Sequence, residues 1–99
     1  MKPILFILKM PFTEGSEDTW FCTHCAMIEG ALNVNPDWEK HIDVRRIDHQ
    51  KPRKELIEVL GEENQWTPVL VIKDQQPMTN PIEITEYLSQ KYGGARPHP

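Results

Sequence analysis

The stretch Cys22-Thr23-His24-Cys25 contains both cysteines of this 99-residue chain, separated by two residues. The apolar run ILFIL at residues 4–8 precedes it, and apolar residues at helical spacing follow it over residues 26–32. A cysteine pair with this spacing, at the entry to a helix inside a β-α-β pattern, is typical of a thiol–disulfide redox motif. The start of a helix carries a partial positive charge that favours the thiolate, which is the nucleophilic form. We therefore expect Cys22 to attack a substrate disulfide and Cys25 to resolve the mixed disulfide.

The composition is that of a single soluble globular domain over residues 1–99. Charged residues make up 26% of the chain and hydrophobic residues 38%, and the net charge is −4. Nucleic-acid binding draws on clustered Lys and Arg, so we expect this chain, which has no basic stripe, to bind none. The apolar run at residues 4–8 is too short for a signal peptide or a membrane span. We therefore expect a cytoplasmic monomer or weak homodimer that binds no membrane, keeps its cysteines reduced and frays at residues 95–99.

Hydrophobic patterning and turn signals predict seven elements in the order β-α-β-α-β-β-α. The expected strands are residues 3–8, 42–47, 69–72 and 77–78, and the expected helices are residues 22–33, 52–60 and 81–92. Helices join the first three strands, so we expect these strands to be parallel, whereas the short turn before residues 77–78 makes the last pair antiparallel. The prediction is an α/β fold with a four-stranded mixed sheet.

The predicted elements leave two features of the sequence unexplained, the long segment at residues 9–21 and the glycine at position 30. The segment at residues 9–21 is long for a connection between a strand and a helix. It is either a lid or recognition element beside the cysteines, or a tolerated surface insertion. Gly30 lies inside the first expected helix, where a glycine costs about 1 kcal/mol relative to alanine. We therefore expect close packing against the sheet at Gly30.

With these elements the chain resembles the thioredoxin superfamily. The resemblance rests on the cysteine pair at the start of the first helix, on the element order, and on Thr67-Pro68 before the third strand. It covers residues 3–92, and the layout is closer to glutaredoxins and to the N-terminal domains of glutathione transferases than to thioredoxin. The chain is also similar to a small family of bacterial proteins described only as a domain of unknown function. The fold that the resemblance implies is a thioredoxin-like three-layer α/β sandwich.

The resemblance also implies a substrate groove beside the cysteines. In the superfamily a cis-proline, which Pro68 matches, lies against the cysteine pair, and the backbone of the preceding residue pairs with a substrate chain or glutathione. Lys9 and residues 79–80 are candidate anchors for glutathione carboxylates, although a lysine after a strand is usually solvated and Asn80 also serves as a helix cap. The expected substrate-binding residues are Lys9, Thr23, Trp66, Thr67, Pro68, Thr79 and Asn80.

The cysteine stretch departs from the superfamily pattern in several ways. The inner pair Thr23-His24 is neither Gly-Pro nor Pro-Tyr, and Phe21 stands where thioredoxins have tryptophan. Residues 4–8 also lack the buried acid that thioredoxins keep on this strand. When protonated, His24 adds positive charge near Cys22 and stabilises its thiolate. We therefore expect His24 to be a catalytic residue together with the two cysteines.

Three functions remain open at this point. The first is a thiol–disulfide oxidoreductase that requires no cofactor, acts on protein or small-molecule disulfides and has glutathione as a candidate reductant. The second is a non-catalytic binding or scaffold module, and the third is a glutathione-binding protein similar to the transferases. We expect no metal site, because one cysteine pair supplies only two of the four ligands that structural zinc needs.

Overall fold

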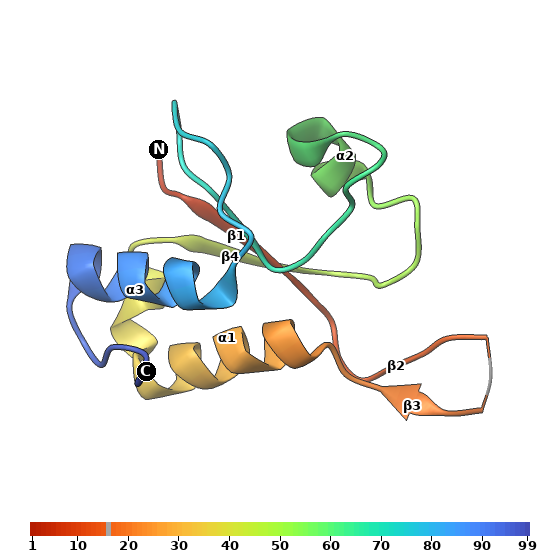
Figure 1. Cartoon of the computed structure of the whole chain (residues 1–99), viewed down its shortest axis with the longest axis horizontal. Coiled ribbons are helices and arrows are strands. Elements are labelled where there is room, and N and C mark those ends of the chain that lie inside the picture. Colours follow the sequence, from red (N-terminus) through yellow and green to blue (C-terminus); the bar gives the residue numbers. More distant parts are fainter. Residues whose placement is uncertain (16) are drawn as a thin grey trace.

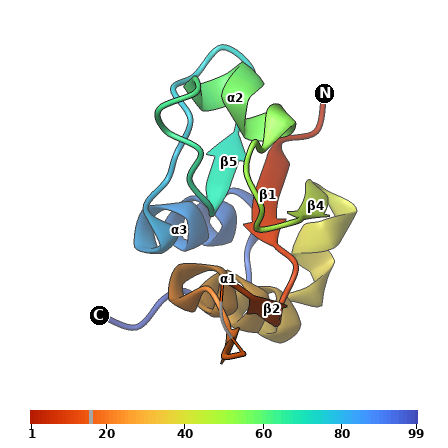
Figure 2. The ribbon, with the colours of Figure 1, turned by 90° about the vertical axis from the view of Figure 1, so that its right-hand side faces the viewer.

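A computed structural model of the chain describes residues 1–15 and 17–99. The elements in chain order are β1 (Ile4–Leu8), β2 (Phe12–Thr13), β3 (Thr19–Trp20), α1 (Thr23–Val34), the 3-10 helix η1 (Pro36–Lys40), β4 (Asp43–Ile47), α2 (Lys54–Leu60), β5 (Val69–Val71) and α3 (Pro81–Tyr92). Helices α1 and α3 lie side by side on one face of the sheet, and α2 lies on the other face (Figures 1 and 2). Within the described ranges no helix is long and apolar enough to cross a membrane.

The main sheet has three strands in the order β4-β1-β5, with β1 in the centre. Ile4, the first residue of β1, lies opposite Asp43 in the parallel strand β4 and opposite Val71 in the antiparallel strand β5. The expectation that residues 69–72 run parallel to the first strand is therefore wrong. After α2, residues 61–68 return the chain to the carboxyl end of β1, so β5 starts there and runs in the opposite direction.

Residues 77–78, expected as a fourth strand, form only one antiparallel bridge, between Leu70 and Met78. Two backbone hydrogen bonds make this bridge, from Leu70 N to Met78 O at 2.8 Å and from Met78 N to Leu70 O at 3.0 Å. Pro77 has no N–H with which to extend the ladder. The four-stranded order is therefore not confirmed, and the edge beyond β5 carries a single bridge.

Residues 9–21, expected as an open loop, contain a second small sheet in which β2 and β3 pair antiparallel. These strands project from the body of the protein beyond the carboxyl end of β1 (Figure 1). We call residues 12–15 and 17–20 the arm. The Phe12 ring stacks on the His49 imidazole, which follows β4, with the ring centroids 4.5 Å apart. This contact fastens the arm to the loop after β4.

The core lies between the sheet and the inner faces of the three helices. Its buried residues include Leu5, Ile7, Ile28, Leu32, Trp38, Leu56, Val69, Leu70, Ile84 and Leu88. The buried Trp38 ring satisfies its polar group by donating its Nε1–H to the carbonyl of Gly93 at 2.7 Å. Asn35 accepts the backbone N–H of Ala95 at 2.7 Å, so the chain after α3 is held against η1.

The ends of the helices follow the expected signals, with shifts of one or two residues at their starts. Asn80 caps α3 by accepting the N–H groups of Ile82 and Glu83 at 2.9 and 3.2 Å. Helix α1 starts one residue later than expected and α2 two residues later. The expectation of close packing at Gly30 is wrong, because a Cβ at this exposed position would meet nothing within 4 Å. The buried residues of α1 include Ile28, and Gly30 faces solvent two residues further on.

Candidate thiol site and its groove

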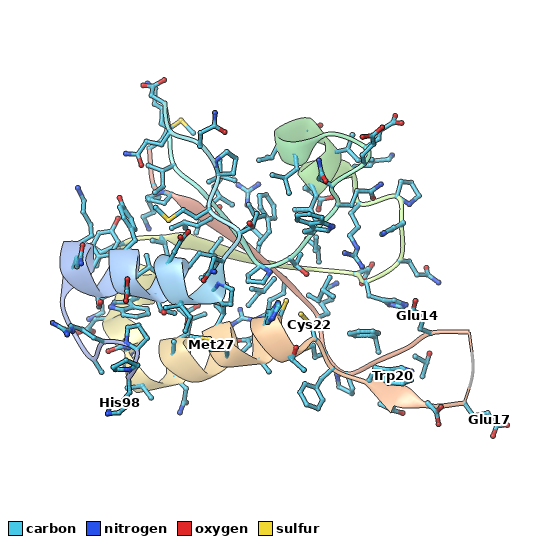
Figure 3. The ribbon with its side chains drawn as sticks, viewed as in Figure 1. Glu14, Glu17, Trp20, Cys22, Met27 and His98 are labelled. Atoms are coloured by element: carbon cyan, nitrogen blue, oxygen red, sulfur yellow. The ribbon has the colours of Figure 1, made fainter. Side chains whose placement is uncertain are left out.

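Cys22 is the N-cap residue of α1 and lies where the arm returns to the body of the protein (Figure 3). Its Sγ accepts the backbone N–H of Cys25 at 3.1 Å. Its own backbone N–H donates to Met10 Sδ at 3.3 Å. An N–H donor at the start of a helix stabilises negative charge on the sulfur that accepts it. Cys22 is also partly exposed, so it is the sulfur of the pair that a substrate can reach.

Cys25 lies one turn further along α1 and has an exposed fraction of 0%. Its thiol donates a hydrogen bond to Thr67 Oγ1 at 3.3 Å. Burial raises the pKa of Cys25 to about 11; the hydrogen bond with Cys22 raises this pKa further, and the hydrogen bond with Thr67 lowers it. Cys25 is therefore protonated at neutral pH. Both cysteines are free thiols, and they differ in exposure, because Cys22 is partly exposed and Cys25 is buried.

Thr67 reaches the cysteines from the connection between α2 and β5. It lies 42 residues from Cys25 in the sequence, and their side chains are joined by the hydrogen bond described above. The Thr67–Pro68 peptide bond is cis, as the resemblance predicts, and Pro68 is buried. The structure thus brings this stretch to the cysteine pair, as the sequence reasoning expected.

A groove with a cavity volume of about 590 Å³ opens next to His24 and Thr67, which adjoin the cysteine pair, although neither cysteine is among its lining residues. Its walls come from the arm, the first turn of α1, the loop after β4, the end of the connection before β5, and the start of α3. The lining residues are Glu14, His24, Lys51, Arg53, Gln65, Trp66, Thr67, Thr79, Asn80 and Pro81. The groove therefore brings together His24, residues 66–67 and residues 79–80, which the sequence analysis had proposed from separate parts of the chain.

Three of the proposed binding residues, Lys9, Thr23 and Pro68, do not line this groove. Lys9 follows β1 and forms an ion pair with Asp48, with Nζ and Oδ1 3.5 Å apart. Thr23 is the exposed first residue of α1. The cation that the structure places on the groove is instead Lys51, which belongs to a locally basic stretch of the sequence, residues 51–54.

The groove carries side-chain charges of both signs. The guanidinium of Arg53 is held by the backbone carbonyls of Gln65, at 2.7 Å, and His49, at 2.8 Å, so it acts as a clamp between two loops. Lys51 and Glu14 are both exposed, and neither makes a hydrogen bond or ion pair with another residue in the described part of the chain. Glu14 was missed by the sequence reasoning, because nothing in the sequence indicates that the arm folds toward the loop after β4.

Three exposed aromatic side chains surround the site. Trp66 lines the groove with 57% of its surface exposed, and Trp20 of the arm and Phe21 before the cysteine pair are 51% and 63% exposed. The groove therefore combines an apolar ring with charged groups at its walls.

The titratable side chains show no arrangement that suggests a metal centre. Among residues 1–15 and 17–99, no group of three or more His, Cys, Asp and Glu side chains is placed to hold a metal ion. The chemistry that the described residues offer at this site is that of two thiols, an imidazole and the charged groups of the groove.

Comparison with known proteins identifies a family and leaves the activity open. Neither the curated proteins nor the solved structures include a significant match to the chain. The family described as "Protein of unknown function (DUF3088)" matches residues 2–96. None of these comparisons supports membership of the thioredoxin superfamily, which stays a prediction. Because the match extends over nearly the whole chain, the protein belongs to the DUF3088 family.

Proposed function

We propose that this protein is a thiol–disulfide oxidoreductase with a thioredoxin-like fold, in which Cys22 is the nucleophile and Cys25 the resolving thiol. The observation that carries the proposal is the difference between the two sulfurs. Cys22 is partly exposed and accepts an N–H at the start of α1, whereas Cys25 is buried and protonated. For the fold, the Leu70–Met78 bridge supports a short fourth strand next to β5.

The proposed reaction has two exchange steps. The Cys22 thiolate attacks a substrate disulfide, forms a mixed disulfide and releases the first substrate thiolate, which takes up a proton. Cys25 then loses its proton and attacks Cys22 Sγ, which forms the Cys22–Cys25 disulfide and releases the second substrate thiol. The protein dithiol is oxidised by two electrons, and the substrate disulfide is reduced to two thiols.

The high pKa of Cys25 fits the second step of this scheme. Negative charge on Cys22 and the hydrogen bond to its sulfur are both among the causes that raise the pKa of Cys25. When Cys22 enters the mixed disulfide it loses that charge, so the pKa of Cys25 falls at the stage where Cys25 must ionise. The Thr67 hydroxyl, which is hydrogen-bonded to Cys25 in the dithiol form, also lowers this pKa.

The substrates in this proposal are protein or small-molecule disulfides, and a low-molecular-weight thiol such as glutathione returns the protein to its dithiol form. Regeneration of this kind needs a reducing compartment, so we propose that the protein works in the cytoplasm. His24 lies on the groove at the start of α1 and adds positive charge there when it is protonated.

A second candidate function is a binding module that uses the groove without turnover. It is favoured by the complete burial of Cys25 and its pKa of about 11, which are also typical of an inert structural cysteine. The two functions differ in one measurable respect, which is whether the cysteine pair cycles between dithiol and disulfide.

Equilibration in glutathione redox buffers, followed by acid quenching and mass spectrometry, tests the proposed function. We expect two thiols to convert to one intramolecular disulfide in a single two-electron transition. Cys22→Ser should abolish the reduction of hydroxyethyl disulfide, whereas Cys25→Ser should stop at a mixed disulfide on Cys22. The Cys22→Ser/Cys25→Ser double variant is the matched control. The proposal is wrong if this control reduces the disulfide as fast as the parent protein, or if no intramolecular disulfide forms.

A further inference from the structure

Besides Arg53, whose guanidinium is held by two backbone carbonyls, the groove next to His24 and Thr67 presents one further cation and one anion from different walls. Lys51 comes from the loop after β4, and Glu14 comes from the arm, on the side that faces this loop (Figure 3). Both side chains are exposed, and neither pairs with another residue in the part of the chain that the structure describes. The groove therefore has one free group for a carboxylate and one for an ammonium.

We propose that the site selects small disulfides with zwitterionic ends, whose carboxylate meets Lys51 and whose ammonium meets Glu14. This inference rests on the proposed function and names its substrate class. The groove volume of about 590 Å³ is in the usual range for small-molecule pockets, about 300–1,000 Å³. An α-amino acid disulfide carries both charges next to its methylene and sulfur atoms. The groove that carries Lys51 and Glu14 is also lined by Thr67, which is hydrogen-bonded to Cys25.

The other charges on the groove disfavour substrates that carry one kind of charge only. Arg53 and, when protonated, His24 add to the positive potential of Lys51, so a disulfide with ammonium groups alone meets repulsion. Glu14 and the net charge of −4 act against a disulfide with carboxylates alone. A zwitterionic end satisfies both walls at once, and a disulfide inside a protein chain lacks such an end.

Trp66 provides the apolar part of the proposed subsite. Its indole lines the same groove with 57% of its surface exposed. It offers a surface for the methylene and sulfur atoms of the substrate, and an aromatic face also attracts an ammonium group. Trp66 comes directly before Thr67 in the chain, and Thr67 is hydrogen-bonded to Cys25.

Four disulfides with different end groups test the inference by their rates of reduction. Cystine carries both charges, cystamine only the ammonium, 3,3′-dithiodipropionate only the carboxylate, and hydroxyethyl disulfide neither. Each kcat/KM is divided by the rate at which dithiothreitol reduces the same disulfide, which removes the intrinsic reactivity. We expect cystine to exceed the neutral disulfide by about tenfold or more, as one well-made charged contact allows. Glutathione disulfide, which has a zwitterionic γ-glutamyl end, shows whether the site accepts the charges at a greater distance from sulfur.

Charge-removing variants assign the two contacts. Lys51→Gln should lower the normalised rates for cystine and dithiodipropionate and leave cystamine unchanged or faster. Glu14→Gln should lower the rates for cystine and cystamine. Lys54→Gln and Glu17→Gln make the same charge changes at exposed residues that do not line the groove, and they should leave the ratios unchanged. Equal effects of the groove variants and their controls would overturn the inference.

A binding measurement separates failure of this inference from failure of the proposed function. The Cys22→Ser/Cys25→Ser variant is titrated with S-methylcysteine, its methyl ester and 3-(methylthio)propionate, and amide and indole NMR signals are followed. We expect S-methylcysteine to shift the NMR signals of Trp66 and His24, and Lys51→Gln to abolish these shifts. This result supports the binding site even if the protein reduces no disulfide. If all disulfides are reduced at similar normalised rates, the inference is wrong and the oxidoreductase stands. If S-methylcysteine produces no saturable shift, the inference is wrong whatever the outcome for turnover.

Discussion

The different states of the two thiols lead to a prediction about their rates of alkylation. The perturbation is a matched pair of variants, Cys25→Ser, which leaves only the accessible Cys22, and Cys22→Ser, which leaves only the buried Cys25. We expect iodoacetamide to label the Cys25→Ser variant quickly at pH 8 and the Cys22→Ser variant slowly. The reason is that alkylation requires the thiolate, and burial keeps Cys25 in its thiol form.

The magnitude follows from the shift in the pKa of Cys25. A rise from the ordinary value of 9.0 to about 11 lowers the thiolate fraction at pH 8 about a hundredfold, from about a tenth to about a thousandth. The Cys22→Ser change removes the electrostatic effect of Cys22, the smallest cause, and its side-chain hydrogen bond, the second largest, but it leaves burial, which is the largest. We therefore expect at least a tenfold difference between the two variants at pH 8. Steric shielding of a side chain that is 0% exposed acts in the same direction.

The assay is the pseudo-first-order rate of iodoacetamide labelling, measured by intact-mass spectrometry between pH 6 and pH 11. For the Cys22→Ser variant the rate should rise about tenfold per pH unit and should still be rising at pH 10, because the thiolate population has not yet reached its plateau. Circular dichroism at each pH confirms that the fold persists. A rate that levels off below pH 9, or equal rates for the two variants at pH 8, would refute the assignment of Cys25 as the protonated thiol.

Three further predictions concern the surroundings of Cys25 and two glycines. Thr67→Val removes the hydroxyl that lowers the pKa of Cys25, so the mixed disulfide on Cys22 should persist longer in quenched-flow mass spectrometry, and Thr67→Ser should restore its decay. The folded protein raises the pKa of Cys25 from 9.0 in the unfolded chain to about 11, so the resulting stabilisation is fully present below pH 9 and is lost as the pH rises to 11. Urea unfolding of the reduced protein should therefore show the free energy of unfolding falling by about 2–3 kcal/mol over this range, and Cys25→Ala should lack this fall. Gly30→Ala should raise the free energy of unfolding by about 0.5–1 kcal/mol, because the position is helical and open. Gly94→Ala should lower the free energy of unfolding by about 1–3 kcal/mol, because φ is +92° at this residue and a Cβ would collide with Asn35.

The sequence predicted the fold well wherever one local signal determines an element. Asn80 and Gly93 mark the two ends of α3, as their capping chemistry requires, and residues 4–8 form the buried central strand. The direction of residues 69–72 was predicted wrongly, because a helix between two strands does not by itself determine where the chain re-enters the sheet. That direction depends on residues 61–68, whose path is decided by tertiary packing and not by local sequence preference.

The candidate site was predictable in its thiols and only partly predictable in its groove. The cysteine spacing and the proline at residue 68 are short motifs with a fixed relation to a helix start and a strand start, so they indicated their neighbourhood correctly. Lys9 was proposed as an anchor from its place after β1, yet it pairs with Asp48. Lys51 is the lysine on the groove, and its position depends on the loop after β4, for which no periodic pattern exists.

The arm explains why a prediction based on the cysteine pair and the expected fold did not include the charged residues of the groove. Its Phe12 ring stacks on His49, which belongs to the loop that also carries Lys51, so the arm and this loop form one unit. Glu14 of the arm and Lys51 of this loop both line the groove. The contacts of the two thiols come from α1 and Thr67, whereas the arm and the loop after β4 supply groove residues that we propose select the substrate. We therefore expect reactivity and selectivity to depend on different segments, so that a substitution in the arm changes the substrate preference without changing the environment of Cys25.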